Sequence, residues 1–233
     1  MDDITFFFQQ PANTVHEMFV AESLTLKRWD EMLAEGWRHN GKMIFRNSQD
    51  FDENNEFRTV LPLRYRLKGL AFTKSQRKIF NKNQDLRHEI HPLSIGVLSD
   101  SIDDEKHELF NKHCVRFKHN RPLSLWDFIS QDVKRPFKTW ELRVFKDDKL
   151  VACSFMDITP QSLSSTYAMF DLEESKRSLG IYTMLLELLY AQAKKKKFYY
   201  PGYAYDTPSF YDYKKKFQNT EFYDWETRLW FPL

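Results

Sequence analysis

The chain has 233 residues, which is enough for one large domain or two small ones with a substantial hydrophobic core. It is 42% hydrophobic with a formal net charge of +2, and no apolar stretch is long enough to cross a membrane as a helix. The first residues are acidic and lack the apolar run of a secretory signal, so we expect a cytoplasmic protein. Cys114 and Cys153 form no CxxC pattern, which fits a reducing compartment and offers no metal framework.

The first part of the chain predicts short elements separated by turn residues. Apolar residues at helical spacing predict a helix over residues 18–35, which ends at Gly36. The pair Asn40-Gly41 predicts the turn of a β-hairpin. Further helical segments are expected at residues 75–85, 103–118 and 125–130.

Residues 58–82 form a basic run that contains no acidic side chain. A solvated surface normally mixes both signs of charge, so this run indicates binding to a polyanion. The interleaved Tyr65, Phe72 and Phe80 are consistent with contacts to RNA. The same alternation also describes the solvent-facing side of an antiparallel strand, and both interpretations stay open.

The second half of the chain is organised around residues 163–205, which predict a strand, a short polar loop at 171–177, a helix and a second strand. Residues 181–193 are nearly all apolar or small, so the helix should be buried on most sides. The four lysines at 194–197 suit its last turn, where the helix dipole favours cations. Pro201-Gly202 should interrupt the strand that begins at Phe198.

Further strands are predicted on both sides of this unit. Residues 140–145 and 149–157 form an antiparallel meander before it, and a helical segment at 209–217 and a strand at 221–230 follow it. The resulting order, β-β-β-α-β-α-β, is that of the GNAT acyltransferases. We therefore expect an α+β fold with a GNAT-like mixed, mostly antiparallel sheet flanked by helices. Residues 136–233 would form this core, and residues 1–135 would form an N-terminal α/β extension packed on it.

The loop before the buried helix resembles the loop with which GNAT enzymes bind the pyrophosphate of coenzyme A. Arg177 and Gly180 match that pattern, but Tyr182 stands where it requires a second small residue. A phenol ring there would fill the space through which a phosphate approaches the backbone, so we expect a GNAT-like scaffold with its coenzyme site closed. The alternatives are that Gly180 only begins a helix, or that the chain is a coenzyme A-dependent N-acetyltransferase.

Histidines are concentrated between residues 88 and 119. His88 and His91 could share one helix face, but Pro92 disfavours a helix there, and no second pair stands at zinc-finger spacing. We therefore predict no metal site. A Ser-His-Asp triad stays open as a weak idea, since the sequence contains no nucleophile elbow.

Several short motifs occur in an order that resembles the aminoacyl-tRNA-protein transferase family, which comprises eukaryotic arginyltransferases and bacterial aspartate/glutamate leucyltransferases. The resemblance covers about residues 30–225, and its most specific part runs from Ser164 to Tyr203. The matching segments are Glu35-Gly36-Trp37-Arg38, Lys74-Ser75-Gln76-Arg77-Lys78, Asn83 with Asp85-Leu86, Ser164-Ser165 with Tyr167 and Phe170-Asp171, Arg177-Ser178-Leu179-Gly180, Tyr199-Tyr200 with Gly202-Tyr203, and Tyr213-Lys214.

This resemblance implies a reaction. The α-amine of a protein's N-terminal residue attacks the ester carbonyl of a charged tRNA, so that leucine or arginine is added to proteins with acidic N-termini and marks them for degradation by an N-degron pathway. The partners would be aminoacyl-tRNA and proteins with exposed N-termini, with no membrane and no cofactor besides the charged tRNA. An α-amine has a pKa near 7.7 to 8.0, so about a tenth is already free at neutral pH and positioning should dominate catalysis.

The resemblance also implies roles for individual residues. Asp171 would orient the incoming ammonium and take its proton, unless it only caps the next turn, and Tyr213 is the second catalytic candidate. The acceptor protein would be held by Ser75, Gln76, Arg77 and Asn83, with the Arg77 guanidinium on an acidic side chain. The aminoacyl-tRNA would be held by Ser165, Tyr167, Ser178, Leu179, Gly180, Tyr203, Lys214, Lys194 and Lys195.

The chain departs from the family pattern in specific places. It lacks the family's cysteine clusters and therefore the metal or cluster that those cysteines serve. Phe210-Tyr211 stands where the family has Lys-Met, and Leu172 replaces the usual proline after Asp171. These departures favour a third interpretation, a non-catalytic relative that binds tRNA or protein.

Overall fold

The computed structural model describes residues 14–51, 56–93, 104–117, 121–129 and 138–233. Its strands are β1 (His16–Val20), β2 (Arg38–Asn40), β3 (Met43–Asn47), β4 (Gln49–Phe51), β5 (Phe57–Arg66), β6 (Arg87–Pro92), β7 (Thr139–Lys146), β8 (Lys149–Ile158), β9 (Ser162–Phe170), β10 (Phe198–Tyr205), β11 (Thr220–Tyr223) and β12 (Trp230–Pro232). Its helices are α1 (Leu26–Ala34), α2 (Lys74–Lys82), α3 (Asp104–Cys114) and α4 (Leu179–Ala193), with the 3-10 helices η1 (Leu125–Asp127), η2 (Leu172–Arg177) and η3 (Phe210–Lys216).

The strands form a large sheet and a small one. The large sheet has the order β12-β11-β5-β10-β9-β8-β7-β6, with β4 also paired to β5, and the small sheet has the order β1-β3-β2. Every pairing in the large sheet is antiparallel except that of β9 with β10. The expected α+β fold with a mixed, mostly antiparallel sheet is therefore confirmed.

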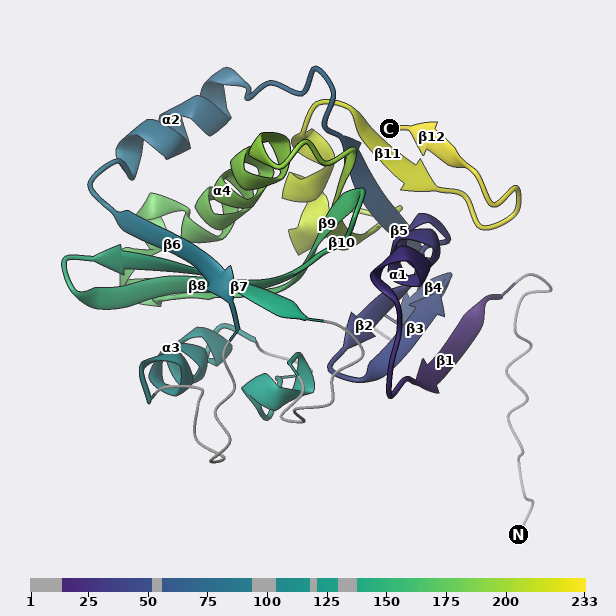
Figure 1. Ribbon diagram of the computed structural model, residues 1–233, viewed down its shortest axis with the longest axis horizontal. Helices are drawn as coiled ribbons and strands as arrows, with labels where there is room; N and C mark the ends of the chain where they lie inside the picture. Colours follow the sequence, from purple (N-terminus) through teal and green to yellow (C-terminus); the bar gives the residue numbers. More distant parts are fainter. Residues whose placement is uncertain (1–13, 52–55, 94–103, 118–120, 130–137) are drawn as a thin grey trace, which may run out of the picture.

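Helices cover both faces of the large sheet, with α4 and α2 on one side and α3 on the other (Figure 1). The side chains of β8 pack in both layers, because successive side chains of a strand point to opposite faces of the sheet. Ala152 and Met156 pack in the cluster that contains α4, whereas Cys153 and Phe155 pack in the cluster that contains α3. In the part of the chain that the structure describes, no helix has the length and apolar character needed to span a bilayer.

The two predicted regions share one sheet. Strands β5 and β6 come from residues 1–135, yet β5 lies between β11 and β10, and β6 pairs with β7. The division at residue 135 therefore does not coincide with a break between sheets, and it stays a prediction.

Most predicted elements are present, but some boundaries differ. The helix expected over 18–35 begins only at Leu26, because the Thr25 side chain accepts a hydrogen bond from the Arg28 N–H and caps it there, while part of the preceding segment forms the edge strand β1. Gly36 lies at φ 84°, in the left-handed region expected after a helix end. The predicted ends of the 103–118 helix lie outside the described residues, and α3 spans Asp104–Cys114.

The strand expected over 221–230 is instead a hairpin of β11 and β12. The Asp224 carboxylate accepts hydrogen bonds from the backbone N–H and the hydroxyl of Thr227, which stabilises the turn. Arg228 adopts φ 58° in the same turn. Local side-chain bonding therefore outweighs the β propensity that suggested one continuous strand.

The first part of the basic run lies on β5, inside the large sheet. Arg64 and Arg66 both form ion pairs with Glu221, at 2.7 and 2.9 Å. Arg64 also lies over the rings of Phe198 and Trp230, each 4.3 Å from the guanidinium carbon. These two arginines therefore stabilise the contacts between neighbouring strands of the sheet, as expected for the solvent-facing side of an antiparallel strand.

Candidate active site

A cavity of about 620 Å³ lies where β9 and β10 separate. The two strands pair only over Ser162–Ser164 and Phe198–Tyr200, although both continue beyond these residues. The pairing of β10 with β5 shifts register between Tyr199 and Gly202, and Gly202 has φ 96°. The interruption predicted at Pro201-Gly202 takes the form of this register shift, because β10 itself continues from Phe198 to Tyr205. The shift helps to open the space between the strands.

The cavity brings together part of the predicted site. The predicted residues that line it are Ser165, Tyr167, Gly180, Tyr203, Tyr213 and Lys214. They come from β9, α4, β10 and η3, so segments as far apart in sequence as residues 165 and 214 meet at one cavity.

Lys214 extends its amine into this cavity from η3. Its Nζ donates a hydrogen bond to the Tyr203 carbonyl at 3.0 Å and lies 4.6 Å from the centre of the Tyr211 ring. Burial, together with the positive charge of Arg38, lowers the pKa of Lys214 to about 7. A large fraction of this amine is therefore neutral near physiological pH.

The cavity is also lined by titratable residues that were not among the predicted site residues. Arg38, Asp50, His113 and Arg116 all line it. Arg38 lies within a family-like motif, which was a usable signal, whereas the sequence around Arg116 offered none. Asp50 is the sole carboxylate among the described lining residues, so the cavity as a whole favours anions.

Arg116 lies at the cavity wall just after α3. Its guanidinium carbon is 4.4 Å from the centre of the Phe210 ring and 5.2 Å from that of Phe170. Within the described ranges no acidic side chain forms an ion pair with it. Stacking on the rings therefore orients a cation that remains available to an anionic ligand.

A carboxylate lies behind the cavity wall on α4. Glu187 is fully buried and accepts hydrogen bonds from the hydroxyls of Ser154 at 2.5 Å and Tyr199 at 2.6 Å. Burial raises its pKa to about 6, although these bonds and one from Ser165 oppose the rise. Because Ser165 itself lines the cavity, it connects Glu187 to the site.

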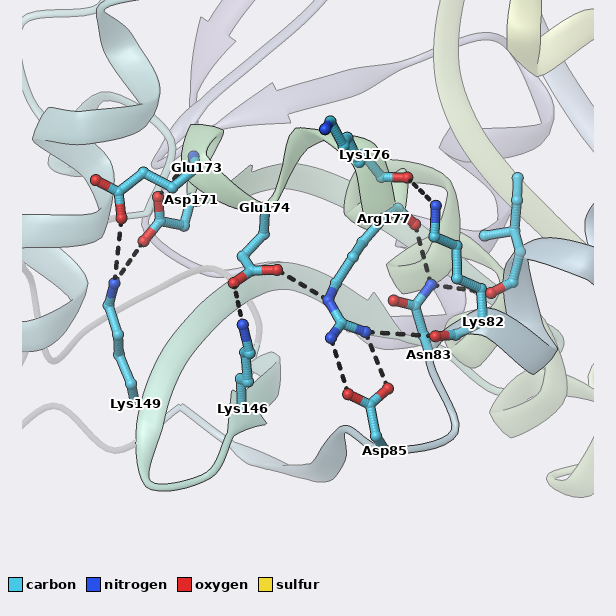
Figure 2. Close-up of polar contacts among 11 residues, drawn as sticks. Lys82, Asn83, Asp85, Lys146, Lys149, Asp171, Glu173, Glu174, Lys176 and Arg177 are labelled. Carbon is cyan, nitrogen blue, oxygen red and sulfur yellow. Dashed lines mark hydrogen bonds and ion pairs between the residues drawn. The ribbon is translucent and has the colours of Figure 1, made fainter.

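Asp171 does not line the cavity. Its carboxylate caps η2 by accepting from the Glu173 N–H at 3.0 Å, and it forms an ion pair with Lys149 at 2.8 Å (Figure 2). Burial opposes its ionisation, but these hydrogen bonds outweigh burial and lower its pKa, which makes it a weak base. The structure thus places Asp171 in the capping position that we considered as the alternative, and its catalytic role stays a prediction.

Arg177 fixes the loop before α4. Its guanidinium donates two hydrogen bonds to the Asp85 carboxylate at 2.9 Å each and one to Glu174 at 2.8 Å (Figure 2). Asn83 adds a hydrogen bond from its side-chain amide to the Arg177 carbonyl at 3.0 Å. Arg177 and Asn83 therefore tie η2 to the end of α2, and the guanidinium is engaged by protein carboxylates rather than directed at a pyrophosphate.

Tyr182 occupies the space between α4 and α2. Its hydroxyl donates to the Asn83 carbonyl at 3.2 Å, and its ring centre lies 5.9 Å from that of Phe80. A Cβ added at Gly180 would come within 3.1 Å of the Phe170 ring, so close packing also requires this glycine. Ser178, which precedes the helix, adopts φ 56°, and Leu179 is fully buried.

The other predicted residues lie elsewhere. Ser75 and Gln76 belong to the first turn of α2, where Gln76 forms a capping box with Thr73. Arg77 on the same helix is exposed and donates to the Phe72 carbonyl. None of the three lines the cavity.

Lys194 and Lys195 lie at the opposite end of α4 from Gly180. A second cavity of about 640 Å³ adjoins that end. Its described lining contains five cationic side chains and no acidic one; the cations are Arg66, Lys68, Lys195, Lys196 and Lys197. Because a helix rises 1.5 Å per residue, the two cavities adjoin opposite ends of a helix about 22 Å long.

Beside the first cavity, a hydroxyl, an imidazole and a carboxylate meet without triad geometry. The Thr166 hydroxyl lies 3.5 Å from His39 Nε2, and Asp157 Oδ2 lies 2.7 Å from the same nitrogen. A catalytic triad requires the carboxylate and the hydroxyl on different ring nitrogens. The His39 and Asp157 pair is therefore structural.

The sequence matches a family model described as arginine-tRNA-protein transferase, C terminus, over residues 77–224. A relative named aspartate/glutamate leucyltransferase from Acinetobacter baylyi is 27% identical over 80% of this chain and 66% of that protein. One of the same name from Shewanella putrefaciens is 26% identical over 84% of this chain and 80% of that protein.

Among solved structures, L-PGS from Bacillus licheniformis superposes with a TM-score of 0.46 at 13% identity, over 73% of this chain and 57% of that chain. The family model, by contrast, covers the described segments from α2 through β11, including both strands of the cavity and the loop that Arg177 fixes. The chain therefore belongs to the arginine-tRNA-protein transferase family.

Proposed function

We propose that this protein transfers an amino acid from a charged tRNA to the N-terminal α-amine of an acceptor protein. The observation that carries the proposal is the family match over a segment that supplies most of the lining of one cavity, which contains cations, aromatic rings and an amine with a lowered pKa. Relatives named aspartate/glutamate leucyltransferase support leucine as the donor residue and acidic N-termini as acceptors. The transfer would mark acceptors for degradation in the cytoplasm, where charged tRNA is available.

The size and the lining of the cavity support this proposal. Its volume of about 620 Å³ lies within the range of roughly 300–1,000 Å³ that is common for small-ligand sites. The rings of Tyr167, Tyr203 and Tyr211 are suited to stack on an unpaired base such as a terminal adenine. The cations would stabilise the oxyanion that develops on the ester carbonyl.

An assay of the purified chain tests this proposal. Labelled Leu-tRNA or Arg-tRNA is incubated with peptides that differ only in their first residue. We expect leucine to be transferred to peptides that begin with Asp or Glu and not to those that begin with Ala. Binding of charged tRNA without transfer to any peptide would instead identify a non-catalytic relative, and heat stabilisation by acetyl-CoA would revive a coenzyme A-dependent activity.

Replacing Arg116 with alanine should reduce transfer to Asp- and Glu-initiated peptides by about 10- to 100-fold, because a charge-assisted hydrogen bond contributes about 1.5–3 kcal/mol. The loss should appear mainly in the KM of the peptide, measured at saturating charged tRNA. Arg116 lies at the cavity wall with no carboxylate partner among the described residues, whereas Arg77 lies on α2 outside the lining.

Arg77→Ala is the matched variant. If Arg77 holds the acidic side chain, as the family resemblance implies, then Arg77→Ala abolishes transfer and Arg116→Ala does not. The side-by-side comparison therefore assigns the acceptor-binding residue to one position or to the other.

The double replacement Lys194→Ala and Lys195→Ala should weaken tRNA binding and make it less dependent on salt. Each lost phosphate contact reduces the slope of log K against log salt concentration by about 0.7 to 0.9. Filter binding or fluorescence anisotropy over a range of salt concentrations measures this slope. Lys27→Ala on the exposed face of α1 should leave the slope unchanged; an equal effect of both changes would exclude the second cavity as a phosphate site.

A further inference from the structure

Lys214 differs from its neighbour Lys215 in its electrostatic partners. Lys215 forms an ion pair with Asp212 at 2.9 Å on the same 3-10 helix. In the described part of the chain, no carboxylate forms an ion pair with Lys214, whose Nζ contacts the Tyr203 carbonyl and the Tyr211 ring. Lys215 therefore has a carboxylate partner, whereas Lys214 has none among the described residues.

The backbone around Lys214 places its amine beside Gly202, and both residues line the cavity. A Cβ added at Gly202 would lie 3.4 Å from the Lys214 Nζ, and the φ of 96° at Gly202 already disfavours a side chain there. The Tyr65 hydroxyl donates to the Lys214 carbonyl at 2.7 Å, which fixes the backbone at this position. Packed aromatic side chains thus hold the amine at the point where β9 and β10 separate.

The titratable groups around this amine carry little compensating charge. Arg38 from β2 is a cation, and burial raises the pKa of each neighbouring phenol, so these phenols stay neutral. They are Tyr65 from β5, Tyr203 from β10, and Tyr211 and Tyr213 from η3. The charged form of the Lys214 amine is therefore disfavoured by burial and by the one nearby cation.

We propose that Lys214 is the catalytic residue that accepts the proton of the attacking amine and returns it to the leaving ribose oxygen. This step rests on the proposed transfer function. The neutral α-amine of the acceptor forms a bond to the ester carbonyl carbon, and its nitrogen becomes positively charged. The neutral Lys214 amine takes one proton from that nitrogen. The bond between carbon and ribose oxygen then breaks, and the Lys214 ammonium protonates this oxygen, so that lysine ends neutral.

The other titratable groups near the cavity are less suited to this step. His113 is held neutral with its Nδ1 accepting from the Phe170 N–H at 3.2 Å, and burial lowers its pKa to about 4. Asp171 and Glu187 do not line the cavity. Asp50 lines it, but it is exposed and accepts a hydrogen bond from the Tyr205 hydroxyl at 2.8 Å, which suits it to orient an ammonium.

Single-turnover transfer by the full chain tests the proposal, with Lys214→Met, Lys214→Arg and the control Lys215→Met. A general base typically contributes about 100-fold or more, so at saturating charged tRNA both Lys214 variants should lose at least that factor in rate. Lys215→Met should keep the wild-type rate. The wild-type rate should rise with pH in two steps, one at about pH 7 from Lys214 and one at about pH 8 from the acceptor α-amine. Only the second step should remain in the residual rate of Lys214→Met.

Each result decides between specific alternatives. If Lys214→Arg keeps the wild-type rate, the residue acts through a fixed positive charge and the proposal is overturned. Nitrogen NMR of the lysine amines, assigned with Lys214→Met, gives the titration midpoint independently of activity, and a midpoint above pH 9 also overturns it. If the wild type itself binds charged tRNA and transfers nothing, the transferase function fails as well; if the wild type and both Lys214 variants transfer equally, this step alone fails.

Discussion

Replacing Asp157 with alanine should lower the free energy of unfolding by about 3–5 kcal/mol, because it leaves buried polar partners without their acceptor. The Asp157 carboxylate is fully buried on β8, and its Oδ2 accepts hydrogen bonds from the Trp29 indole at 3.1 Å and from His39 at 2.7 Å. These partners come from α1 and β2, so the carboxylate fastens the N-terminal elements to the large sheet. Denaturant unfolding followed by tryptophan fluorescence measures the change.

Asp157→Asn is the matched control. The Trp29 indole N–H donates to Asp157 Oδ2, so an asparagine with its carbonyl at that position keeps this hydrogen bond and should cost less than the alanine. Equal losses for both variants would show that the charge matters more than the hydrogen bonds. A loss below 1 kcal/mol for Asp157→Ala would contradict the structural role of this contact.

Acidification should destabilise the protein through His113, by about 3 kcal/mol between pH 6.5 and pH 4. The ordinary pKa of histidine is 6.5, and burial lowers that of His113 to about 4 in the folded state. Below pH 6.5 the unfolded chain therefore binds the proton before the folded chain does. The stability that the neutral His113 side chain contributes is fully present above pH 6.5 and is lost as the pH falls through 4. Urea denaturation at a series of pH values measures it.

His113→Asn should remove this pH dependence, because the asparagine oxygen can still accept a hydrogen bond from the Phe170 N–H but does not titrate.

Glu187 changes the stability with pH in the opposite direction. Its pKa is raised from 4.5 to about 6, so its contribution of about 2 kcal/mol is present below pH 4.5 and is lost as the pH rises through 6. Relative to the wild type, His113→Asn should therefore gain stability on acidification and Glu187→Gln should lose it. Parallel curves for the wild type and His113→Asn would contradict the assignment.

The local elements were predictable because their signals come from residues close in sequence. The strand, loop, helix and strand of residues 163–205 appear as β9, η2, α4 and β10, and the interruption at Pro201-Gly202 is present as a register shift. Errors occurred where a short side chain redirected the backbone, at Thr25 and at Asp224. The family was also recognisable, since its motifs keep their order along the chain.

The composition of the candidate site was predictable only in part. Ser165, Tyr203 and Lys214 line the cavity as expected, but Asp171 and Arg77 have protein partners outside its lining. A motif shows that a residue is typical of a family. The contacts of that residue depend on which distant elements pack against it.

Most helices and strands and the family of this protein could be predicted from the sequence, because periodicity, turn residues and motif order are properties of neighbouring residues. Which charges meet depends instead on how distant segments pack together. Arg38, Arg116 and Lys214 come from three separate parts of the chain and share one cavity. The lowered pKa of Lys214 likewise arises from burial and from Arg38, and neither effect can be read from the residues beside it in the chain.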